Sequence, residues 1–420
     1  MMNKEYLTVQ EALAAVLNPI TILPAEKVDL LAALGRVLAE PIVARDSLPP
    51  FANSAMDGYA LQAADLTAAT KPQPQTLRVV GDIAAGAVPD VVVEAGTAVR
   101  IMTGAPIPPG ADAVIPVEDT NESWRDKERP LPDQILVYRS VNAGDYLRHA
   151  GENIMAGQVV VQAGHLLRPQ EIGILASLGV SQISVIRRPR VGILATGDEL
   201  IPVEEALRPG KIRNSNGYTQ AAQVIALGAL PITLGIARDT EEDVRAKLQI
   251  GLDAGVDLLI SSAGVSVGAY DVVKAVLEAE GNVGFWRVRM RPGKPLAYGT
   301  YHGVPYLGLP GNPVSAMVSF ERFARAVILK MEGYTNLERP QVQAILQDEI
   351  QSDGRESYIR AVVEKRDGRY IATTTGSQGS HIMTSLVRAN ALLIVPEGVL
   401  TVYKGQTIMA WMLNWPETVF

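Results

Sequence analysis

Four short loops in the middle of the chain combine glycine with proline or small polar residues. They are residues 195–200 (ATGDEL), 261–268 (SSAGVSVG), 291–295 (RPGKP) and 309–313 (LPGNP). Glycine lets backbone N–H groups approach a phosphate closely, and a helix that begins at such a loop adds a favourable dipole. One loop of this kind is as readily an ordinary strand-to-helix turn, but four together favour a ligand that carries phosphate. None matches the P-loop or Rossmann pattern, so those two nucleotide sites are not indicated.

Positive charge gathers beside the third of these loops. Arg287, Arg289 and Arg291 alternate with apolar residues, and Lys294 follows closely. On a β-strand this two-residue period would place the three guanidinium groups on one face. The group therefore predicts an anion-binding surface in a chain whose net charge is −7. The alternative is a solvated edge strand.

Carboxylates in or beside polar turns could hold a divalent cation on such a phosphate. They are Asp57, Glu199, Asp239 and Asp271, and carboxylate oxygens are ligands that Mg²⁺ prefers. Asp239 and Asp271 also stand where they could cap a helix, whereas Asp57 has no obvious capping role. The chain has no cysteine, and its four histidines lack metal-ligand spacing. This composition excludes thiolate metal sites and iron–sulfur clusters and disfavours a His-rich zinc site.

The composition is that of a folded protein with more than one domain. The chain has 420 residues, 47% of them hydrophobic and 20% charged, which predicts about three domains. The net charge of −7 argues against general nucleic-acid binding, which needs an excess of lysine and arginine. The first ten residues have no apolar signal region, and no run suits a bilayer span. We therefore expect a cytoplasmic protein with neither nucleic acid nor membrane as a partner.

The first part of the chain is predicted to be helical and then β-rich. Residues 9–17 have the apolar spacing of one helix face, with Thr8 as a cap, and residues 28–38 form a second predicted helix. From about residue 45 to 148, short β-branched runs alternate with glycine and proline turns. These runs predict strands at 79–80, 91–93, 114–115 and 135–137.

From about residue 189 to 333 the pattern alternates between strands and helices. Predicted strands lie at 191–194, 232–234 and 258–260, and predicted helices at 217–227, 241–252, 271–279 and 313–331. This alternation is typical of a parallel sheet covered by helices. In such sheets ligands bind at the carboxyl ends of the strands, where the four loops would lie. After residue 333 the pattern is β-rich again.

Seven motifs in one order resemble a known family. They are residues 53–60 (NSAMDGYA), 100–106 (RIMTGAP), 196–200 (TGDEL), 261–268 (SSAGVSVG), 292–295 (PGKP), 309–316 (LPGNPVSA) and 379–381 (GSH). Together they resemble the molybdopterin molybdenumtransferases, the bacterial MoeA proteins, and are similar to the gephyrin E domain. The resemblance extends from about residue 5 to 415. Each motif alone is modest, but seven in register are specific.

The resemblance implies a fold of α/β plus β-rich class with four domains. A discontinuous helical domain (1–44 and 149–188) would hold an inserted β-rich domain (45–148). A central α/β molybdopterin-binding domain with a parallel-rich sheet (189–333) would precede a β-barrel-like domain (334–420). The resemblance also implies an elongated homodimer, with the site between the third domain of one protomer and the second domain of the other.

The resemblance also implies the reaction. The family inserts molybdate into adenylylated molybdopterin and releases AMP and molybdenum cofactor; Mg²⁺ is required, and the molybdopterin adenylyltransferase is the expected partner. By motif, the catalytic residues would be Asp57, Thr103, Glu199 and Asp271, and the metal ligands Glu199, Asp239 and Asp271. The substrate-binding residues would be Gly197, Asp239, Ser262, Gly264, Ser266, Gly268, Arg287, Arg291, Lys294, Pro310, Gly311, Asn312, Pro313 and Ser380.

Three positions depart from the family pattern. Arg287 and Arg291 stand where the family has lysines, so the charge is kept while a planar fork replaces a point charge. Asn153 stands where the family often has an aspartate, and an amide can be neither a base nor an anionic ligand. Either that position only orders its loop, or the neighbouring Glu152 substitutes for it.

Two other functions fit parts of the pattern. The adenylyltransferase that makes the adenylylated pterin has a fold that resembles the third domain, but it gives no reason for residues 53–60. A scaffold role is suggested by gephyrin, yet this chain has no disordered linker or second catalytic module.

Overall fold

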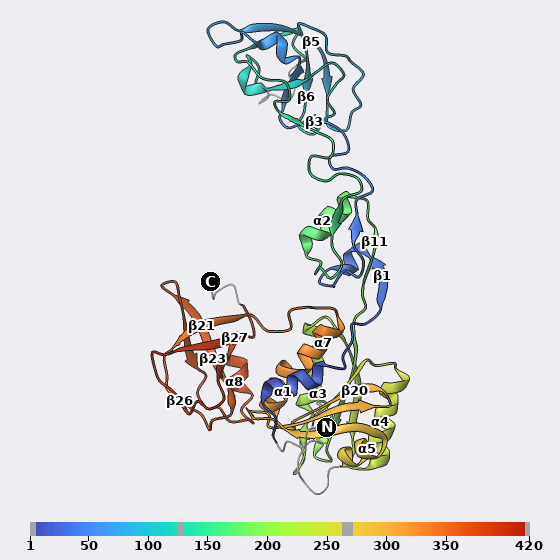
Figure 1. The fold of residues 1–420 in the computed structure, drawn as a ribbon, viewed down its shortest axis with the longest axis vertical. Helices are drawn as coiled ribbons and strands as arrows, with labels where there is room; N and C mark the ends of the chain where they lie inside the picture. Colours follow the sequence, from blue (N-terminus) through green and yellow to red (C-terminus); the bar gives the residue numbers. More distant parts are fainter. Residues whose placement is uncertain (1–5, 124–129, 263–271, 416–420) are drawn as a thin grey trace. The chain divides into compact units, whose positions relative to one another are not determined.

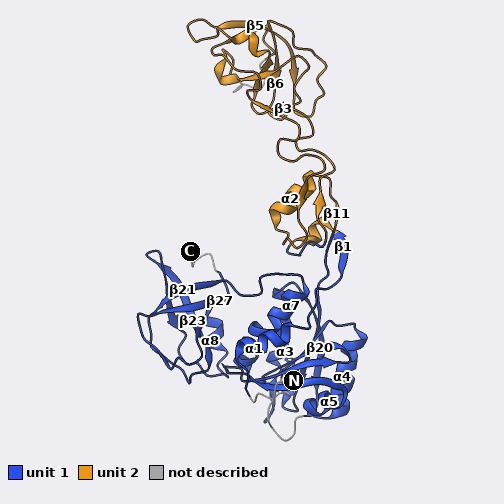
Figure 2. Cartoon of the chain, viewed as in Figure 1, with its two compact units in different colours: residues 1–28, 35–39, 184–420 blue, residues 29–34, 40–183 orange. Residues whose placement is uncertain are grey.

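The computed structural model describes residues 6–123, 130–262 and 272–415. The chain divides into two compact units (Figure 2). Unit 1 comprises residues 1–28, 35–39 and 184–420, and unit 2 comprises residues 29–34 and 40–183. The chain passes between the units within β1 (Ala25–Asp29) and β11 (Gln182–Ile186), which pair with each other.

The centre of unit 1 is a six-stranded sheet, in which β20 is labelled in Figure 1. Its strand order is β15-β12-β16-β20-β19-β17. Its parallel strands are β12 (Arg190–Thr196), β15 (Leu230–Ala237), β16 (Leu258–Ser262) and β20 (Val304–Leu309). The antiparallel strands β19 (Pro295–Tyr301) and β17 (Gly281–Arg287) complete one side. The predicted parallel sheet and the three predicted strands within it are confirmed.

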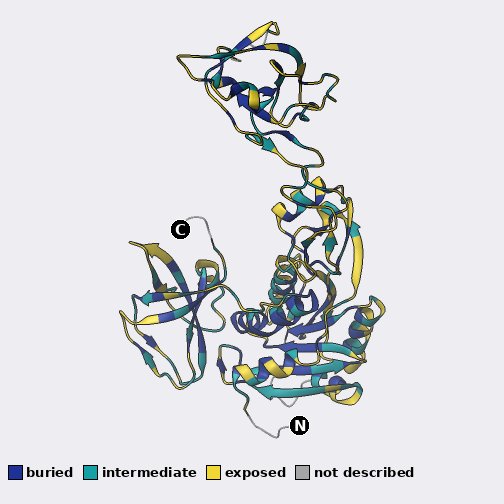
Figure 3. Cartoon of the chain, turned by 45° about the horizontal axis from the view of Figure 1, so that its top comes forward, coloured by how far each residue is buried: buried dark blue, intermediate teal, exposed yellow. Residues whose placement is uncertain are grey.

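Helices cover both faces of this sheet, because successive residues of a buried strand point to opposite sides. Ile193 and Ile260 pack with α1 (Val9–Leu17), α3 (Ser215–Ala226) and the helical segment 313–331. Leu194 and Leu259 pack with α4 (Glu241–Asp253) and α5 (Val272–Glu280). Buried residues therefore concentrate in the sheet and its covering helices (Figure 3).

The predicted helix at 313–331 is interrupted by a π-helical turn. It consists of α6 (Pro313–Ser319), the π-helix η4 (Phe320–Ala324) and α7 (Arg325–Met331). The predicted helix at 9–17 is α1, and its Thr8 cap is confirmed, since Glu11 N donates to Thr8 Oγ1 at 3.1 Å.

A second sheet of unit 1 closes into a barrel-like cylinder. Its order is β18-β23-β24-β21-β27-β25, with an additional pairing of β23 and β25. The strands are β18 (Met290–Arg291), β21 (Gln341–Leu346), β23 (Glu356–Arg366), β24 (Arg369–Thr374), β25 (Ala391–Val395) and β27 (Thr407–Met412). The short strands β22 (Ile350–Gln351) and β26 (Thr401–Val402) pair separately, and α8 (Thr384–Arg388) contacts β23.

Unit 2 holds a five-stranded sheet in the order β7-β4-β6-β5-β8. Its strands are β4 (Gly58–Leu61), β5 (Gln75–Ile83), β6 (Thr97–Ile101), β7 (Ala113–Pro116) and β8 (Gln134–Val137). Two short pairs, β3 (Asn53–Ser54) with β9 (Leu147–Arg148) and β2 (Ile42–Val43) with β10 (Val159–Val161), and the helix α2 (Pro169–Ser177) complete the described elements. The β-rich prediction is confirmed.

Two local predictions are wrong. Residues 28–38 are not a helix: only the short 3₁₀ helix η1 (Leu30–Ala33) forms, and Gly35 has a φ of 74°. Instead, Ala39 N donates to Ser184 O at 3.0 Å and Ile186 N to Val37 O at 2.9 Å. Residues 91–93 belong to no strand, and Val93 N donates to Pro109 O at 2.8 Å. In both places, hydrogen bonds to distant segments of the chain determine the backbone conformation. The local sequence pattern does not predict such contacts.

Candidate functional site

A pocket of about 530 Å³ in unit 1 brings together residues from three of the motifs. We call it the anion pocket. Six of its lining residues are predicted site residues, and the other lining residues include Ser315, Arg355 and Gln378. The six are Arg291, Lys294, Pro310, Gly311, Asn312 and Ser380. The predicted Pro313 directly follows this loop and begins α6.

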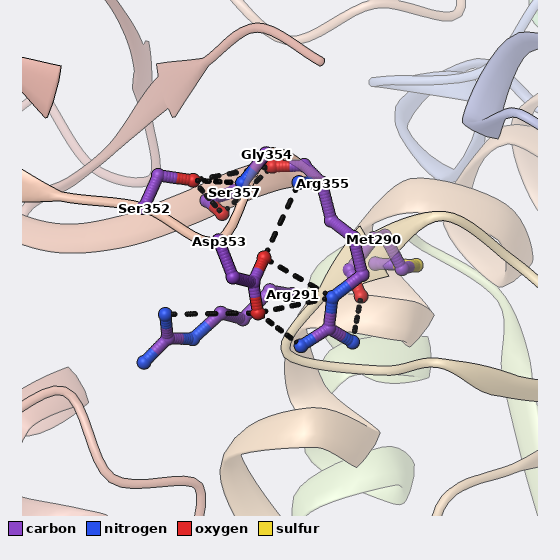
Figure 4. A network of polar contacts seen from close by, with 7 residues as sticks. All are labelled: Met290, Arg291, Ser352, Asp353, Gly354, Arg355 and Ser357. Carbon is purple, nitrogen blue, oxygen red and sulfur yellow. Dashed lines mark hydrogen bonds and ion pairs between the residues drawn. The ribbon is translucent and has the colours of Figure 1, made fainter. Parts of the chain in front are cut away.

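Three cations line the anion pocket, and their partners differ. Arg355 forms an ion pair with Asp353 and donates to Met290 O at 3.1 Å (Figure 4). The Arg355 guanidinium is also the main reason that the pKa of Asp353 lies below its ordinary value. Arg291 contacts the same carboxylate only at 3.8 Å. One aspartate thus faces two guanidinium groups, so positive charge remains for an anionic ligand.

Residues 378–380 form one wall of the anion pocket, and Arg360 holds this wall in place. The sequence did not indicate a role for Arg360. Its backbone N donates to Gln378 Oε1 at 2.9 Å, and Gln378 Nε2 donates to Arg360 O at 3.2 Å. The Arg360 side chain is 1% exposed and donates to Ser385 Oγ and Gly379 O. Burial, with a smaller contribution from Arg291, lowers the pKa of Arg360 to about 10. Ser380 O accepts from Val314 N at 3.1 Å, which joins this wall to α6.

The opposite wall is the loop between β20 and α6. Asn312 has the backbone angles of an N-cap before Pro313, but its side chain makes no capping hydrogen bond. It lines the anion pocket instead. Gly311 O accepts from Asn216 Nδ2 of α3 at 2.7 Å. A helix that is distant in the sequence therefore supports this loop.

A pair of carboxylates lies at the carboxyl ends of β12 and β15. Asp239 N donates to Asp198 Oδ1 at 3.2 Å, and Asp198 N donates to Asp239 Oδ2 at 3.3 Å. We call Asp198 and Asp239 the carboxylate pair. Asp239 does not cap α4, because Thr240 does so by accepting from Asp243 N. The capping alternative for Asp239 is therefore wrong, and its carboxylate is exposed beside Asp198.

The carboxylate pair fits Mg²⁺, which proteins commonly hold by one or two carboxylates with phosphate oxygens and water. No group of three or more histidine, aspartate or glutamate side chains that could hold a metal occurs in the described part of the chain. Glu199 follows the pair and is exposed, and its carboxylate lies against Gly197, where an added Cβ would be 2.4 Å from Glu199 Oε2. The predicted ligand set of Glu199, Asp239 and Asp271 stays a prediction.

Several predicted residues lie at the end of β16 or follow it in the sequence. Ser262 is the last residue of that strand, is 2% exposed and lies opposite Ala195 and Leu309. The predicted Gly264, Ser266, Gly268 and Asp271 lie outside the described residues. Their roles stay predictions.

The two residues predicted to be catalytic in unit 2 lie side by side. Thr103 donates to Asp57 Oδ1 through both its backbone N and its hydroxyl, each at 2.7 Å. Asp57 and Thr103 are exposed. The carboxylate therefore has a structural task as well, since it orders the turn that follows β6.

The predicted arginine row on a single strand is wrong. β17 ends at Arg287, and β18 begins at Met290 and pairs with β23 in the barrel-like sheet. Arg287 and Lys294 lie over the ring of Tyr6, at 5.7 and 5.2 Å from its centroid. Arg289 forms an ion pair with Glu397 at 2.8 Å. Arg291 and Lys294 line the anion pocket, whereas Arg287 and Arg289 do not.

The turn that departs from the family pattern is tightly ordered. Glu152 Oε2 accepts from His149 N at 2.9 Å, and Asn153 N donates to Leu48 O at 2.9 Å. Gly151 has a φ of 75°, a left-handed backbone conformation that glycine adopts readily. The contact of Glu152 agrees with a role in ordering the loop.

Comparison with known proteins decides the family. The family descriptions that match are the MoeA N-terminal region (domain I and II) at residues 7–179, a probable molybdopterin binding domain at 192–330 and the MoeA C-terminal region (domain IV) at 343–413. The chain is 38% identical over 395 residues to a molybdopterin molybdenumtransferase of Nostoc sp., covering 92% of this chain and 88% of the relative. The chain belongs to the molybdopterin molybdenumtransferase family.

Other proteins that are similar to this chain belong to the same family of transferases. A molybdopterin molybdenumtransferase of Bacillus subtilis is 35% identical over 398 residues, covering 92% of this chain and 91% of the relative. The crystal structure of a molybdopterin biosynthesis MoeA protein from Pyrococcus horikoshii superimposes with a TM-score of 0.81 at 32% identity, covering 97% of this chain and all of that one. The predicted family and fold class are confirmed. No described helix is long and apolar enough to cross a bilayer.

Proposed function

We propose that this protein inserts molybdate into adenylylated molybdopterin, with Mg²⁺-dependent release of AMP. The observation that carries the proposal is the anion pocket, where Arg291, Lys294 and Arg355 gather in a chain of net charge −7. Family membership supports the same reaction. The carboxylate pair, which follows the adjacent strands β12 and β15 of the same unit, supports the handling of the phosphoanhydride.

The anion pocket suits a tetrahedral oxyanion. Molybdate is a dianion, and guanidinium groups and an ammonium group can satisfy its oxygens with charge-assisted hydrogen bonds. Ser315 and Ser380 add hydroxyl groups to the same lining. Because Arg355 is already fixed by Asp353 and Met290 O, it enters binding with little loss of freedom.

The carboxylate pair would hold Mg²⁺ next to the substrate anhydride. When bound, this ion would neutralise the charge that develops on the leaving AMP. Asp198 Oδ1 and Asp239 Oδ2 each accept a backbone N–H, so the two side chains are held in place for this task. Lys211 donates to Asp198 O, which adds a positive charge at the same loop.

Asp57 suits a proton-transfer step. Insertion requires each dithiolene sulfur to lose a proton, and the two protons leave with one molybdate oxygen as water. Thr103 holds Asp57 through Oδ1 alone, which leaves Oδ2 to take up and pass on a proton.

The decisive experiment measures AMP release from adenylylated molybdopterin by the purified protein. Release that requires both molybdate and Mg²⁺, and that falls roughly tenfold or more in Arg355→Ala, supports the proposal. Arg366→Ala is the matched control, because Arg366 is 63% exposed on the same barrel and, among the residues that the structure describes, forms its ion pair with Glu364, two residues away. Pyrophosphate formation from ATP and molybdopterin, without molybdate-dependent AMP release, would instead favour the adenylyltransferase function.

We also propose that the protein works in the cytoplasm as a homodimer that receives its substrate from the molybdopterin adenylyltransferase. Family resemblance supports this proposal. Light scattering on the purified chain tests the dimer, and transfer of labelled substrate from the adenylyltransferase in the presence of excess unlabelled substrate tests the partner. A monomer at micromolar concentration would contradict the first part.

A further inference from the structure

Asp353 lies beside the anion pocket without lining it, in the turn between β22 and β23. Its carboxylate accepts from Arg355 Nε at 3.1 Å and from Arg355 Nη2 at 2.5 Å. Arg291 Nη1 approaches the same carboxylate at 3.8 Å, too far for a hydrogen bond. The carboxylate therefore lies between two of the cations that line the pocket (Figure 4).

The turn that carries Asp353 is ordered by hydrogen bonds of its backbone. Gly354 N donates to Ser352 Oγ at 3.3 Å. Ser352 N donates to Leu400 O at 2.7 Å, and Gly354 O accepts from Gly398 N at 2.8 Å, so the turn is tied to the segment between β25 and β26. An anion that enters the pocket therefore meets a negative charge with a fixed place.

Asp353 changes the charge of the pocket but leaves donors for a ligand. Arg355 donates to Asp353 through Nε and Nη2 and to Met290 O through Nη1, so each outer nitrogen keeps one further N–H. The Arg355 guanidinium holds the pKa of Asp353 below its ordinary value, which keeps the carboxylate ionised at neutral pH. One of the positive charges in the pocket lining is therefore offset before any ligand binds.

We infer that Asp353 is a specificity-determining residue of the anion pocket, because its fixed negative charge weakens the binding of each oxyanion in proportion to the charge of that oxyanion. Repulsion between a carboxylate and an anion grows linearly with the charge of the anion. At a separation of roughly 6 Å in water it lowers affinity about threefold for a monoanion, about tenfold for a dianion and about thirtyfold for a trianion.

This selectivity suits a site that must also release its anion. Where the inference concerns molybdate it rests on the proposed function, in which molybdate leaves the pocket for the pterin. Tight binding of a substrate in its ground state does not speed such a step. Polyphosphates carry more negative charge than molybdate and are repelled more strongly. Asp353 thus favours a loosely held dianion over more highly charged phosphates.

Molybdate and perrhenate provide the test, because they are tetrahedral oxyanions of similar size, one a dianion and the other a monoanion. Asp353→Asn keeps an oxygen that accepts from Arg355 and removes only the charge. By calorimetry at low salt, we expect this variant to bind molybdate roughly tenfold more tightly and perrhenate only about threefold more tightly than wild type. Asp353→Glu keeps the charge and should preserve the wild-type ratio of the two affinities.

Glu397→Gln is the matched control, because Glu397 forms an ion pair with Arg289 at 2.8 Å and Arg289 does not line the pocket. It should leave both affinities nearly unchanged. Asp353→Ser repeats the test with a shorter uncharged side chain, and the ratio of the two affinities should again rise about threefold. Equal changes for both anions would overturn the inference, since altered shape or a displaced Arg355 affects both anions alike. Unchanged or weaker binding of molybdate by Asp353→Asn would also overturn it.

Failure of the proposed function is visible separately. In the assay of AMP release, Asp353→Asn should lower the KM for molybdate roughly tenfold without raising kcat. If the wild-type protein binds both anions but releases no AMP in a molybdate-dependent way, the proposed reaction is wrong, and the two affinities still decide the role of Asp353. If AMP release depends on molybdate but both affinities change equally in Asp353→Asn, only the role of Asp353 is wrong.

Discussion

At the scale of single residues, Asp57 combines a structural contact with a proposed chemical role. Both hydrogen bonds from Thr103 end on Asp57 Oδ1. An asparagine can accept the same two bonds through its amide oxygen, but it has no negative charge and cannot act as a base. The contact and the charge can therefore be separated by a single substitution.

We predict that Asp57→Asn folds normally and loses molybdate-dependent AMP release by roughly 100-fold or more, the usual contribution of a general acid or base. Thr103→Val removes only one of the two bonds and should cost less than about tenfold. Rates at saturating Mg²⁺ and molybdate, with melting temperatures for both variants, provide the test. Near-normal turnover of Asp57→Asn would remove this carboxylate from the mechanism.

Glu332, the residue after α7, is a buried carboxyl that the proposed reaction does not use. It is 8% exposed, and its Oε2 has no hydrogen-bond partner among the described residues. Burial raises the pKa of Glu332 to about 8, against a smaller opposing effect of Arg188 and Arg36. Between its ordinary pKa of 4.5 and about 8, the folded protein keeps a proton that the unfolded chain has lost. Folding stability from this group is therefore present at low pH and is lost as the pH rises through that window.

We predict that Glu332→Gln stabilises the protein increasingly from pH 5 to pH 8, because the amide cannot ionise. The measurement is the difference in melting temperature between variant and wild type across that range. Glu364→Gln, at a residue that is 50% exposed, is the control and should give a smaller, flatter difference. A difference for Glu332→Gln that does not grow with pH would show that this carboxyl titrates normally.

At the scale of elements, α3 supports the loop that forms one wall of the anion pocket. Asn216 Nδ2 donates to Gly311 O at 2.7 Å, and Gln223 Nε2 donates to Glu321 Oε1 at 2.9 Å. The helix thus holds the loop before α6 and the helical segment that follows it.

We predict that Asn216→Ala weakens molybdate binding by about threefold to tenfold, because the loop at Gly311 loses its support, and lowers stability by about 1 kcal/mol. Asn216→Asp should behave alike, since a carboxylate cannot donate the bond. Gln249→Ala is the control: its amide bonds to Asp253 of its own helix. The measurement is the affinity for molybdate by calorimetry. An unchanged affinity in both Asn216 variants would contradict the role of Asn216 in positioning the Gly311 loop.

At the scale of the whole molecule, the anion pocket exists only because two parts of unit 1 share one core. Tyr358, Leu392 and Trp411 of the barrel-like sheet pack in the same cluster as Phe320 and Phe323 of the helical segment. Arg322 of η4 is 4% exposed, lies 5.0 Å from the Trp411 ring centroid and donates to both oxygens of Glu338. These contacts fix Arg355 and Ser380 from the barrel opposite Lys294 and Asn312.

We predict that Arg322→Ala lowers molybdate affinity by roughly tenfold and increases protease cleavage between residues 333 and 340, because the barrel is held less firmly. Arg322→Lys keeps the charge but loses the planar contact with Trp411, so an intermediate effect is expected. Calorimetry and timed proteolysis are the measurements. Wild-type affinity in Arg322→Ala, with cleavage increased, would show that the pocket does not depend on this contact.

The sequence by itself determined the elements and the family. Short, nearly continuous apolar runs predicted β12, β15 and β16, because strands of a parallel sheet that is covered by helices are rich in apolar residues. Thr8 and Glu11 predicted the start of α1, since a capping box is a local interaction. The seven motifs also predicted the family, and with it six of the residues that line the anion pocket.

Only the tertiary structure decided which of these residues meet. Arg287, Arg289 and Arg291 are two residues apart, yet they face Tyr6, Glu397 and Asp353 because the chain leaves one sheet and joins another between them. Arg355 lines the anion pocket, and Arg360 and Asn216 hold its lining residues Gly379 and Gly311, from segments far away in the chain. Local periodicity carries no information about such contacts, because they depend on how separate elements pack, and packing is settled by the whole core at once.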